Sequence, residues 1–164
     1  MSEQNPVLHL VCGKIAAGKS TLADRLASTP ATVLISEDRW LSRLYPGEIN
    51  GLEDYVRRSG CLADAMGPHV ETLLCAGLSV VMDFPANTPN QRQRLRGIFE
   101  SAGVAHRLHF LDVPDAVCKA RLGQRNEDGT HDYAASDAEF DLFTSYFVPP
   151  APEEGFTVIT YDES

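Results

Sequence analysis

The sequence predicts an α/β domain of three layers, in which a parallel sheet of five strands is covered by helices on both faces. Short apolar runs alternate along the chain with segments whose apolar residues recur at helical spacing, an alternation typical of such domains. The length of 164 residues suits one compact unit. No internal repeat, low-complexity tract or linker divides the sequence, so we expect a single domain over residues 1–164.

The strands are predicted where apolar runs end at polar or turn-forming residues. These runs are Val7–Cys12, Ala31–Ser36, Ser79–Phe84, Arg107–Leu111 and Phe156–Tyr161. Between the second and third runs, Tyr45-Pro46-Gly47 and Asn50-Gly51 are typical of turns, and this region is expected to form loops.

The first three helices are predicted from apolar spacing and from the residues at their ends. One begins near Lys19, and a second covers about Cys61–Ala76 before Gly77, a plausible stop. A third begins at Thr88-Pro89, because threonine caps a helix and proline suits its first position, and it ends at Gly103.

Two more helices are expected near the carboxyl terminus. Asp112 and Pro114 open the first, which runs through Arg125. Ser136 and Glu139 have the spacing of a capping box, which predicts the start of the second. Its apolar stripe is expected to end before Pro149-Pro150 and consists of Phe140, Phe143 and Phe147.

Composition excludes several classes of protein. The formal net charge of −9 argues against a basic nucleic-acid surface, although a local cleft can still be basic. The cysteines form no C-x-x-C pair and the histidines show no ligand spacing with them, so reduced thiols and no structural zinc are expected. The N-terminus MSEQNP is unlike a signal peptide, and no apolar run reaches membrane-spanning length. We expect a cytoplasmic protein without a membrane partner.

The strongest motif follows the first strand and matches G-x-x-x-x-G-K-[ST] without a mismatch. Glycines in such a loop let successive backbone N–H groups point at phosphate oxygens, and the following helix directs its positive end at the same anion. Chance would place this pattern in roughly one chain in two hundred of this length. The expected nucleotide-binding residues are Gly13, Lys14, Ile15, Ala16, Ala17, Gly18, Lys19, Ser20 and Thr21. They predict a P-loop that binds a nucleoside triphosphate.

A P-loop needs ligands for Mg²⁺ besides the phosphates. Ser20 offers a hydroxyl, and Lys19 places a positive charge at the β- and γ-phosphates. Asp83 ends the run Val80-Val81-Met82, at the carboxyl end of a predicted strand where ligands of open α/β sheets bind. We expect Ser20 and Asp83 at the metal; the alternative for Asp83 is a turn or helix-capping aspartate.

A candidate general base follows the second strand. Asp38 in Ser36-Glu37-Asp38-Arg39 could face the P-loop and accept a proton from a substrate hydroxyl. The alternative is a solvated N-cap aspartate, and Glu37 is the nearest competitor for the role of base.

Two arginines are candidates for phosphate contacts. Arg121 and Arg125 lie four residues apart on a predicted helix, so they share a face. They precede the polar loop Asn126–Thr130, which suggests a closing lid over residues 121–136 that neutralises the transferring phosphoryl group. The alternative is an exposed charged face.

These segments resemble the P-loop kinase-like family of small predicted kinases, often labelled AAA-type ATP-binding proteins. Its relatives include the polynucleotide 5′-hydroxyl kinases, chloramphenicol phosphotransferase and the zeta toxins. The resemblance continues through Arg121-Leu122-Gly123-Gln124-Arg125-Asn126 and the Phe140/Phe143/Phe147 stretch. It implies the strand order 2-3-1-4-5 and ATP- and Mg²⁺-dependent phosphorylation of a hydroxyl. By analogy Asp38 is the base, Arg121 and Arg125 are the lid arginines, and Lys19, Ser20 and Asp83 serve phosphate and metal.

The acceptor site is the least constrained by this resemblance. Polynucleotide kinases carry an arginine three residues beyond the base, where this chain has Leu41, and Ala16 is taken to replace a proline common in the family's P-loop. Candidate substrate contacts are Arg39, Tyr55, Asn87 and Arg92. Within about Trp40 to Arg58, an acceptor pocket could also use Trp40, Tyr45, Arg57 and Arg58, or Trp40 and Tyr45 could be core residues.

Three functions fit these features. The leading hypothesis is a kinase that transfers the γ-phosphoryl group of ATP to a hydroxyl of a small molecule or nucleoside. The second is a nucleotide-binding regulatory protein with slow ATP hydrolysis. The third is a polynucleotide 5′-hydroxyl kinase, against which Leu41 and the negative net charge both count.

Overall fold

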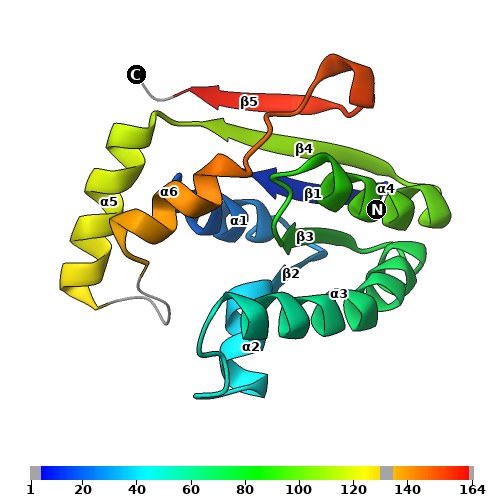
Figure 1. Ribbon diagram of the computed structural model, residues 1–164. Coiled ribbons are helices and arrows are strands. Elements are labelled where there is room, and N and C mark those ends of the chain that lie inside the picture. Colours follow the sequence, from blue (N-terminus) through cyan, green and yellow to red (C-terminus); the bar gives the residue numbers. More distant parts are fainter. Residues whose placement is uncertain (1–4, 130–134, 163–164) are drawn as a thin grey trace.

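A five-stranded parallel sheet forms the centre of the protein, as the sequence predicts (Figure 1). The computed structural model describes residues 5–129 and 135–162. The strands are β1 (Val7–Cys12), β2 (Thr32–Ser36), β3 (Ser79–Asp83), β4 (Ala105–Asp112) and β5 (Val158–Asp162). Their order is β2-β3-β1-β4-β5, and every neighbouring pair is parallel. The order expected from the resemblance is therefore confirmed.

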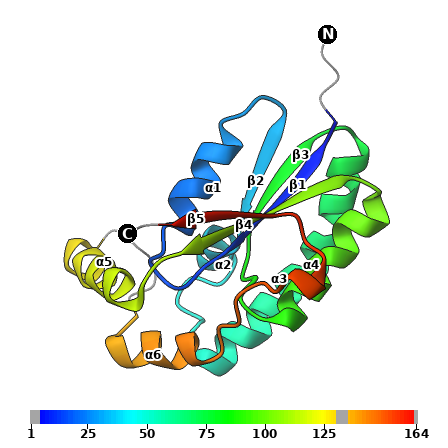
Figure 2. The ribbon, with the colours of Figure 1, turned by 90° about the horizontal axis from the view of Figure 1, so that it is seen from above.

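The helices cover both faces of the sheet (Figure 2). They are α1 (Lys19–Ala27), α2 (Glu37–Leu44), α3 (Leu52–Cys75), α4 (Pro89–Ala102), α5 (Asp115–Asp128) and α6 (Asp137–Ser145), with a short 3₁₀ turn η1 at Pro152–Glu154. Of the helices among the described residues, none combines the length and apolarity needed to cross a membrane.

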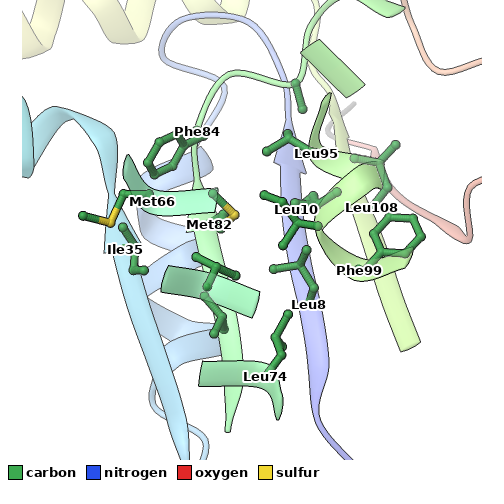
Figure 3. Close-up of a cluster of buried hydrophobic side chains, with 14 of the residues drawn as sticks. Leu8, Leu10, Ile35, Met66, Leu74, Met82, Phe84, Leu95, Phe99 and Leu108 are labelled. Atoms are coloured by element: carbon green, nitrogen blue, oxygen red, sulfur yellow. The ribbon is translucent and has the colours of Figure 1, made fainter. Parts of the chain in front are cut away.

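Alternation along β1 divides the core into two clusters. Leu8 and Leu10 face α3 and α4, and the large cluster there includes Met82, Phe99 and Leu108 (Figure 3). Val11 faces the opposite side, where residues of α1, α5 and α6 form a smaller cluster. Side chains alternate across a strand, so β1 serves both layers and is nearly free of polar residues.

The helix caps follow the expected residues. The Thr88 hydroxyl accepts a hydrogen bond from Gln91 N, and Gly103 ends α4 in the left-handed conformation that favours glycine. Ser136 and Glu139 form the predicted capping box at the start of α6.

One helix and several element boundaries differ from the sequence prediction. Helix α2 was not expected, although Ser36 caps it and Glu37 and Asp38 occupy its first turn. Helix α3 begins at Leu52, nine residues before the predicted start at Cys61, and it continues through Pro68. Helix α5 continues to Asp128, so the first part of the predicted polar loop Asn126–Thr130 is helical. Helix α6 ends at Ser145, so Phe147 of its predicted apolar stripe lies beyond the helix.

Candidate active site

The P-loop connects β1 to α1 and has two residues with positive φ. Gly18 has φ 104°, as glycine permits, and Ala16 has φ 62°. Since proline fixes φ near −65°, assigning Ala16 to the family's proline position is wrong. A Cβ added at Gly13 would lie 3.3 Å from Cβ of Ala17 and 3.4 Å from that of Leu111, so the loop packs closely on β4.

Lys19 lies inside the curve of this loop. Its Nζ donates hydrogen bonds to the carbonyl oxygens of Gly13 at 2.7 Å and Lys14 at 2.8 Å. Burial lowers the pKa of Lys19, while the charge of Asp83 opposes that shift. An anion bound in the loop would balance the positive charge of the Lys19 ammonium group.

Ser20 and Asp83 meet at the carboxyl end of the sheet. The Ser20 hydroxyl donates to Oδ2 of Asp83 at 3.2 Å. Burial raises the pKa of Asp83, and Lys19 acts in the opposite direction. A hydroxyl and a carboxylate are hard oxygen donors that suit Mg²⁺, with phosphates and waters completing the shell. Residues 5–129 and 135–162 contain no cluster of three or more histidine, cysteine or acidic residues for a metal.

Asp38 is exposed in the first turn of α2, and its carboxylate accepts no hydrogen bond from the residues that the structure describes. Burial lowers the pKa values of Lys19 and Arg125, and the negative charge of Asp38 opposes both shifts. The charge of Asp38 therefore acts both on the P-loop lysine and on Arg125 of α5. Its carboxylate is available to a substrate.

Glu37, the other candidate for the general base, is hydrogen-bonded by side chains of α3. Its exposed fraction is only 3%. The Tyr55 hydroxyl donates to Oε1 at 2.5 Å, and the Ser59 hydroxyl donates to Oε2 at 2.7 Å. Burial raises the pKa of Glu37, and the two hydrogen bonds oppose that shift. The carboxylate of Glu37 is therefore occupied by partners within the protein, whereas the carboxylate of Asp38 beside it is exposed.

The arginines of α5 face the same region. Arg121 donates from Nη1 to the carbonyl oxygen of Ala17 at 3.3 Å, which places its guanidinium against the P-loop. Nε of Arg125 is buried and lacks a hydrogen-bond partner among the described residues. Figure 1 shows α5 and α6 beyond the carboxyl ends of β1 and β4. Of the predicted lid, residues 130–134 lie outside the described part of the chain.

Two predicted substrate contacts have other partners. Asn87 Oδ1 accepts a hydrogen bond from Gly13 N at 3.0 Å, and the Asn87 carbonyl accepts one from Val148 N at 2.8 Å. Arg92 is fully buried and pairs with Glu154 at 2.8 Å, and its Nη1 also donates to Ala86 O. Asn87 thus positions the P-loop, and Arg92 joins α4 to η1 in the interior, where it cannot reach a substrate.

Among the other acceptor candidates, Arg39 and Trp40 share one cavity. Arg39 pairs with Asp24 of α1 at 3.0 Å, and Tyr55 holds Glu37. Trp40 is 40% exposed and lines a cavity of about 380 Å³ together with Leu34, Ser36, Arg39, Arg43 and Leu44.

The remaining two arginines lie on α3, where Arg57 pairs within the helix and Arg58 contacts the segment that follows α2. Arg58 lies over the Tyr45 ring, 4.3 Å from its centroid, and Arg57 pairs with Asp54 at 3.7 Å. Sequence inspection missed Ser59 as a partner of Glu37, although its i,i+4 spacing from Tyr55 would have indicated a shared face.

The AAA domain family matches residues 8–150 of this sequence. The chain belongs to this family. This match agrees with the resemblance to the P-loop kinase-like family that the sequence indicates. No curated protein matches the chain.

Solved structures with the same fold include several kinases. A candidate kinase from Chloroflexus aurantiacus is 26% identical with a TM-score of 0.73, over 97% of this chain and 86% of that one. Chaetomium thermophilum Kti12, in complex with ADP-AlF3, is 15% identical with a TM-score of 0.67, over 96% and 90% of the chains. The APS kinase CysC of Mycobacterium tuberculosis is 19% identical with a TM-score of 0.58, over 98% and 91%. This AAA-domain protein therefore has kinase-like structural neighbours.

Proposed function

We propose that the protein is an ATP-dependent kinase that phosphorylates a hydroxyl of a small molecule or nucleoside. The observation that carries this proposal is the position of Asp38. Its carboxylate is free of hydrogen bonds from the described residues, yet its charge acts on Lys19 and Arg125. A protein that only holds a nucleotide needs the P-loop but no open carboxylate beside it.

In the proposed reaction the acceptor hydroxyl oxygen forms a bond to the γ-phosphorus of ATP. The bond from that phosphorus to the β–γ bridging oxygen breaks, and ADP leaves with the electron pair. Asp38 orients the hydroxyl and takes its proton. Lys19, Arg121 and Arg125 stabilise the negative charge on the transferring group. Mg²⁺ held by Ser20 and Asp83 would neutralise charge on the β- and γ-phosphates.

The two alternatives predict different observations. In a regulatory protein with slow ATP hydrolysis, Asp38 would have no chemical role. No hydroxyl compound would accelerate the ATP turnover of such a protein. A polynucleotide 5′-hydroxyl kinase would need contacts to the acceptor's phosphates near the base. At the position three residues beyond Asp38, Leu41 is buried in the large core cluster and offers no such contact.

The test is a screen of Mg²⁺-dependent ADP formation with sugars, nucleosides, antibiotics and 5′-hydroxyl oligonucleotides. The proposal expects at least one small hydroxyl compound to accelerate turnover and to be recovered in phosphorylated form. Lys19→Ala should abolish that signal. Turnover that no small compound accelerates would contradict the proposal, and stimulation by oligonucleotides alone would support the third function.

A further inference from the structure

The side chain of Glu37 joins the start of α2 to the first half of α3. Both of its carboxylate oxygens are used, one by Tyr55 and one by Ser59, over donor–acceptor distances of 2.5 and 2.7 Å. Tyr55 and Ser59 are four residues apart, so they lie on one face of α3. Neither the P-loop motif nor the phosphate chemistry accounts for this buried cluster.

We infer that Glu37 is a positioning residue that fixes the candidate base Asp38, by holding the first turn of α2 against α3 through Tyr55 and Ser59. This inference rests on the proposed function, because it assigns Asp38 the role of base.

Because Glu37 and Asp38 are neighbours in the chain, the restraint on Glu37 also limits the movement of Asp38. Glu37 and Asp38 are consecutive at the start of α2, so they point in directions about 100° apart. With Glu37 fixed on α3, the backbone that carries Asp38 is fixed as well, and the charge of Asp38 acts on Lys19, Asp83 and Arg125.

Other restraints on this turn are weak. The N-cap hydrogen bond from Arg39 N to the Ser36 hydroxyl is long, at 3.4 Å. The ion pair between Arg39 and Asp24 is about half exposed on both sides, so it contributes little rigidity. Leu41 anchors α2 in the core one turn later. Of the restraints on the residues next to Asp38, the Glu37 cluster is thus the buried one with short hydrogen bonds.

The conservative replacement separates geometry from charge. In Glu37→Gln, the amide oxygen can still accept from Tyr55, and the amide N–H can donate to Ser59, whose hydroxyl also accepts. Glu37→Gln should therefore keep the turn in place, whereas Glu37→Ala removes both restraints. A double variant, Tyr55→Phe with Ser59→Ala, removes the same hydrogen bonds and leaves α2 unchanged in sequence.

Two measurements test the inference on the full-length chain. Amide hydrogen exchange in residues 37–45 should accelerate at least roughly tenfold in Glu37→Ala and in the double variant, and should stay at the wild-type rate in Glu37→Gln. With an acceptor found by the screen, kcat should fall about 10- to 100-fold in Glu37→Ala with little change in the KM for ATP, and Glu37→Gln should restore it. Glu53→Gln, an exposed acidic residue in the first turn of α3, is the control.

Unchanged exchange and unchanged kcat in Glu37→Ala would overturn the inference. So would a loss of transfer in Glu37→Gln with normal exchange, because Glu37 would then act in the chemistry itself. If the wild-type protein transfers no phosphoryl group, the proposed function fails. The exchange rates still decide whether Glu37 fixes the turn that carries Asp38.

Discussion

Oδ1 of Asn87 accepts a hydrogen bond from the backbone N–H of Gly13 at 3.0 Å, across 74 positions of sequence. The bond joins the loop after β3 to the first residue of the P-loop. Asn87 is itself fixed, because its N–H donates to the Gln91 side chain and its carbonyl accepts from Val148 N. The start of the P-loop is thus tied to the loop before α4 and to the segment after α6.

Removing this amide should weaken nucleotide binding. In Asn87→Ala the Gly13 N–H loses its partner, and a lost hydrogen bond of about 1 kcal/mol corresponds to a KM for ATP raised roughly fivefold. Steady-state kinetics with ATP and acceptor varied separately provide the check. Asn90→Ala, at an exposed asparagine in the first turn of α4, should match the wild type. If Asn87→Ala leaves the KM for ATP unchanged and raises the KM for the acceptor, Asn87 is a substrate contact and not a P-loop contact.

Ala16 should tolerate glycine and reject proline. At φ 62° an alanine is strained, so Ala16→Gly should leave the protein equally stable or stabilise it by up to about 1 kcal/mol. Ala16→Pro demands a φ near −65° and should abolish ATP binding.

Isothermal calorimetry and thermal unfolding measure these two effects. Ala31 has φ 56° ahead of β2, so Ala31→Gly is a matched control that should leave ATP affinity unchanged. Normal ATP binding by Ala16→Pro would show that the loop backbone differs from the one described here.

The pair of Arg92 and Glu154 should dominate the stability of the α4–η1 contact. Arg92 is fully buried, so Glu154→Ala leaves a buried guanidinium without its carboxylate and should cost roughly 3 kcal/mol. Urea unfolding measures this loss. Asp64→Ala breaks the exposed pair with Arg94 and should cost less than about 1 kcal/mol. Equal losses in both variants would contradict a structural role for Arg92.

Acid should destabilise the sheet through His109. This side chain is buried between His9 at 3.0 Å and the Tyr161 hydroxyl at 2.9 Å. Burial, with help from His9 and Arg107, lowers its pKa to about 4 from the usual 6.5. Between these values the unfolded chain binds a proton and the folded chain does not, so stability is full above pH 6.5 and falls toward pH 4.

The loss attributable to His109 should be on the order of 2 kcal/mol. Urea unfolding at several pH values measures it, and His109→Gln should flatten the dependence over this range. His69→Gln, at an exposed position on α3, should keep the wild-type profile. A profile that His109→Gln leaves unchanged would assign the acid sensitivity to other groups.

The parts of the fold that follow local patterns were predictable from sequence. The five strands and the helix caps at Thr88, Gly103 and Ser136 depend on residues that are close to them in sequence. These features lie near the positions that the sequence patterns indicate. Helix α2 was missed because only its cap and first-turn acids identify it, and the turn signals at Tyr45-Pro46-Gly47 follow directly.

Long-range partners were not predictable from sequence. Arg92 lies on the helix expected after Thr88-Pro89, but its partner Glu154 is 62 positions away. Likewise, nothing local distinguishes Asn87 as a P-loop contact from Asn87 as a substrate contact. Asp38, Arg121 and Arg125 remain predictions as catalytic residues, since the structure describes their positions and not a reaction.

The role of Asp38 is tested most directly by single-turnover phosphoryl transfer in Asp38→Asn, with ATP affinity measured on the same preparation. Asparagine keeps the shape of the side chain and removes its capacity to take a proton. Asp64→Asn, an exposed acidic residue on α3, is the control. We predict that transfer to the acceptor falls about 100-fold or more while the Kd for ATP is unchanged. Transfer at the wild-type rate in Asp38→Asn would contradict the assignment of Asp38 as the general base.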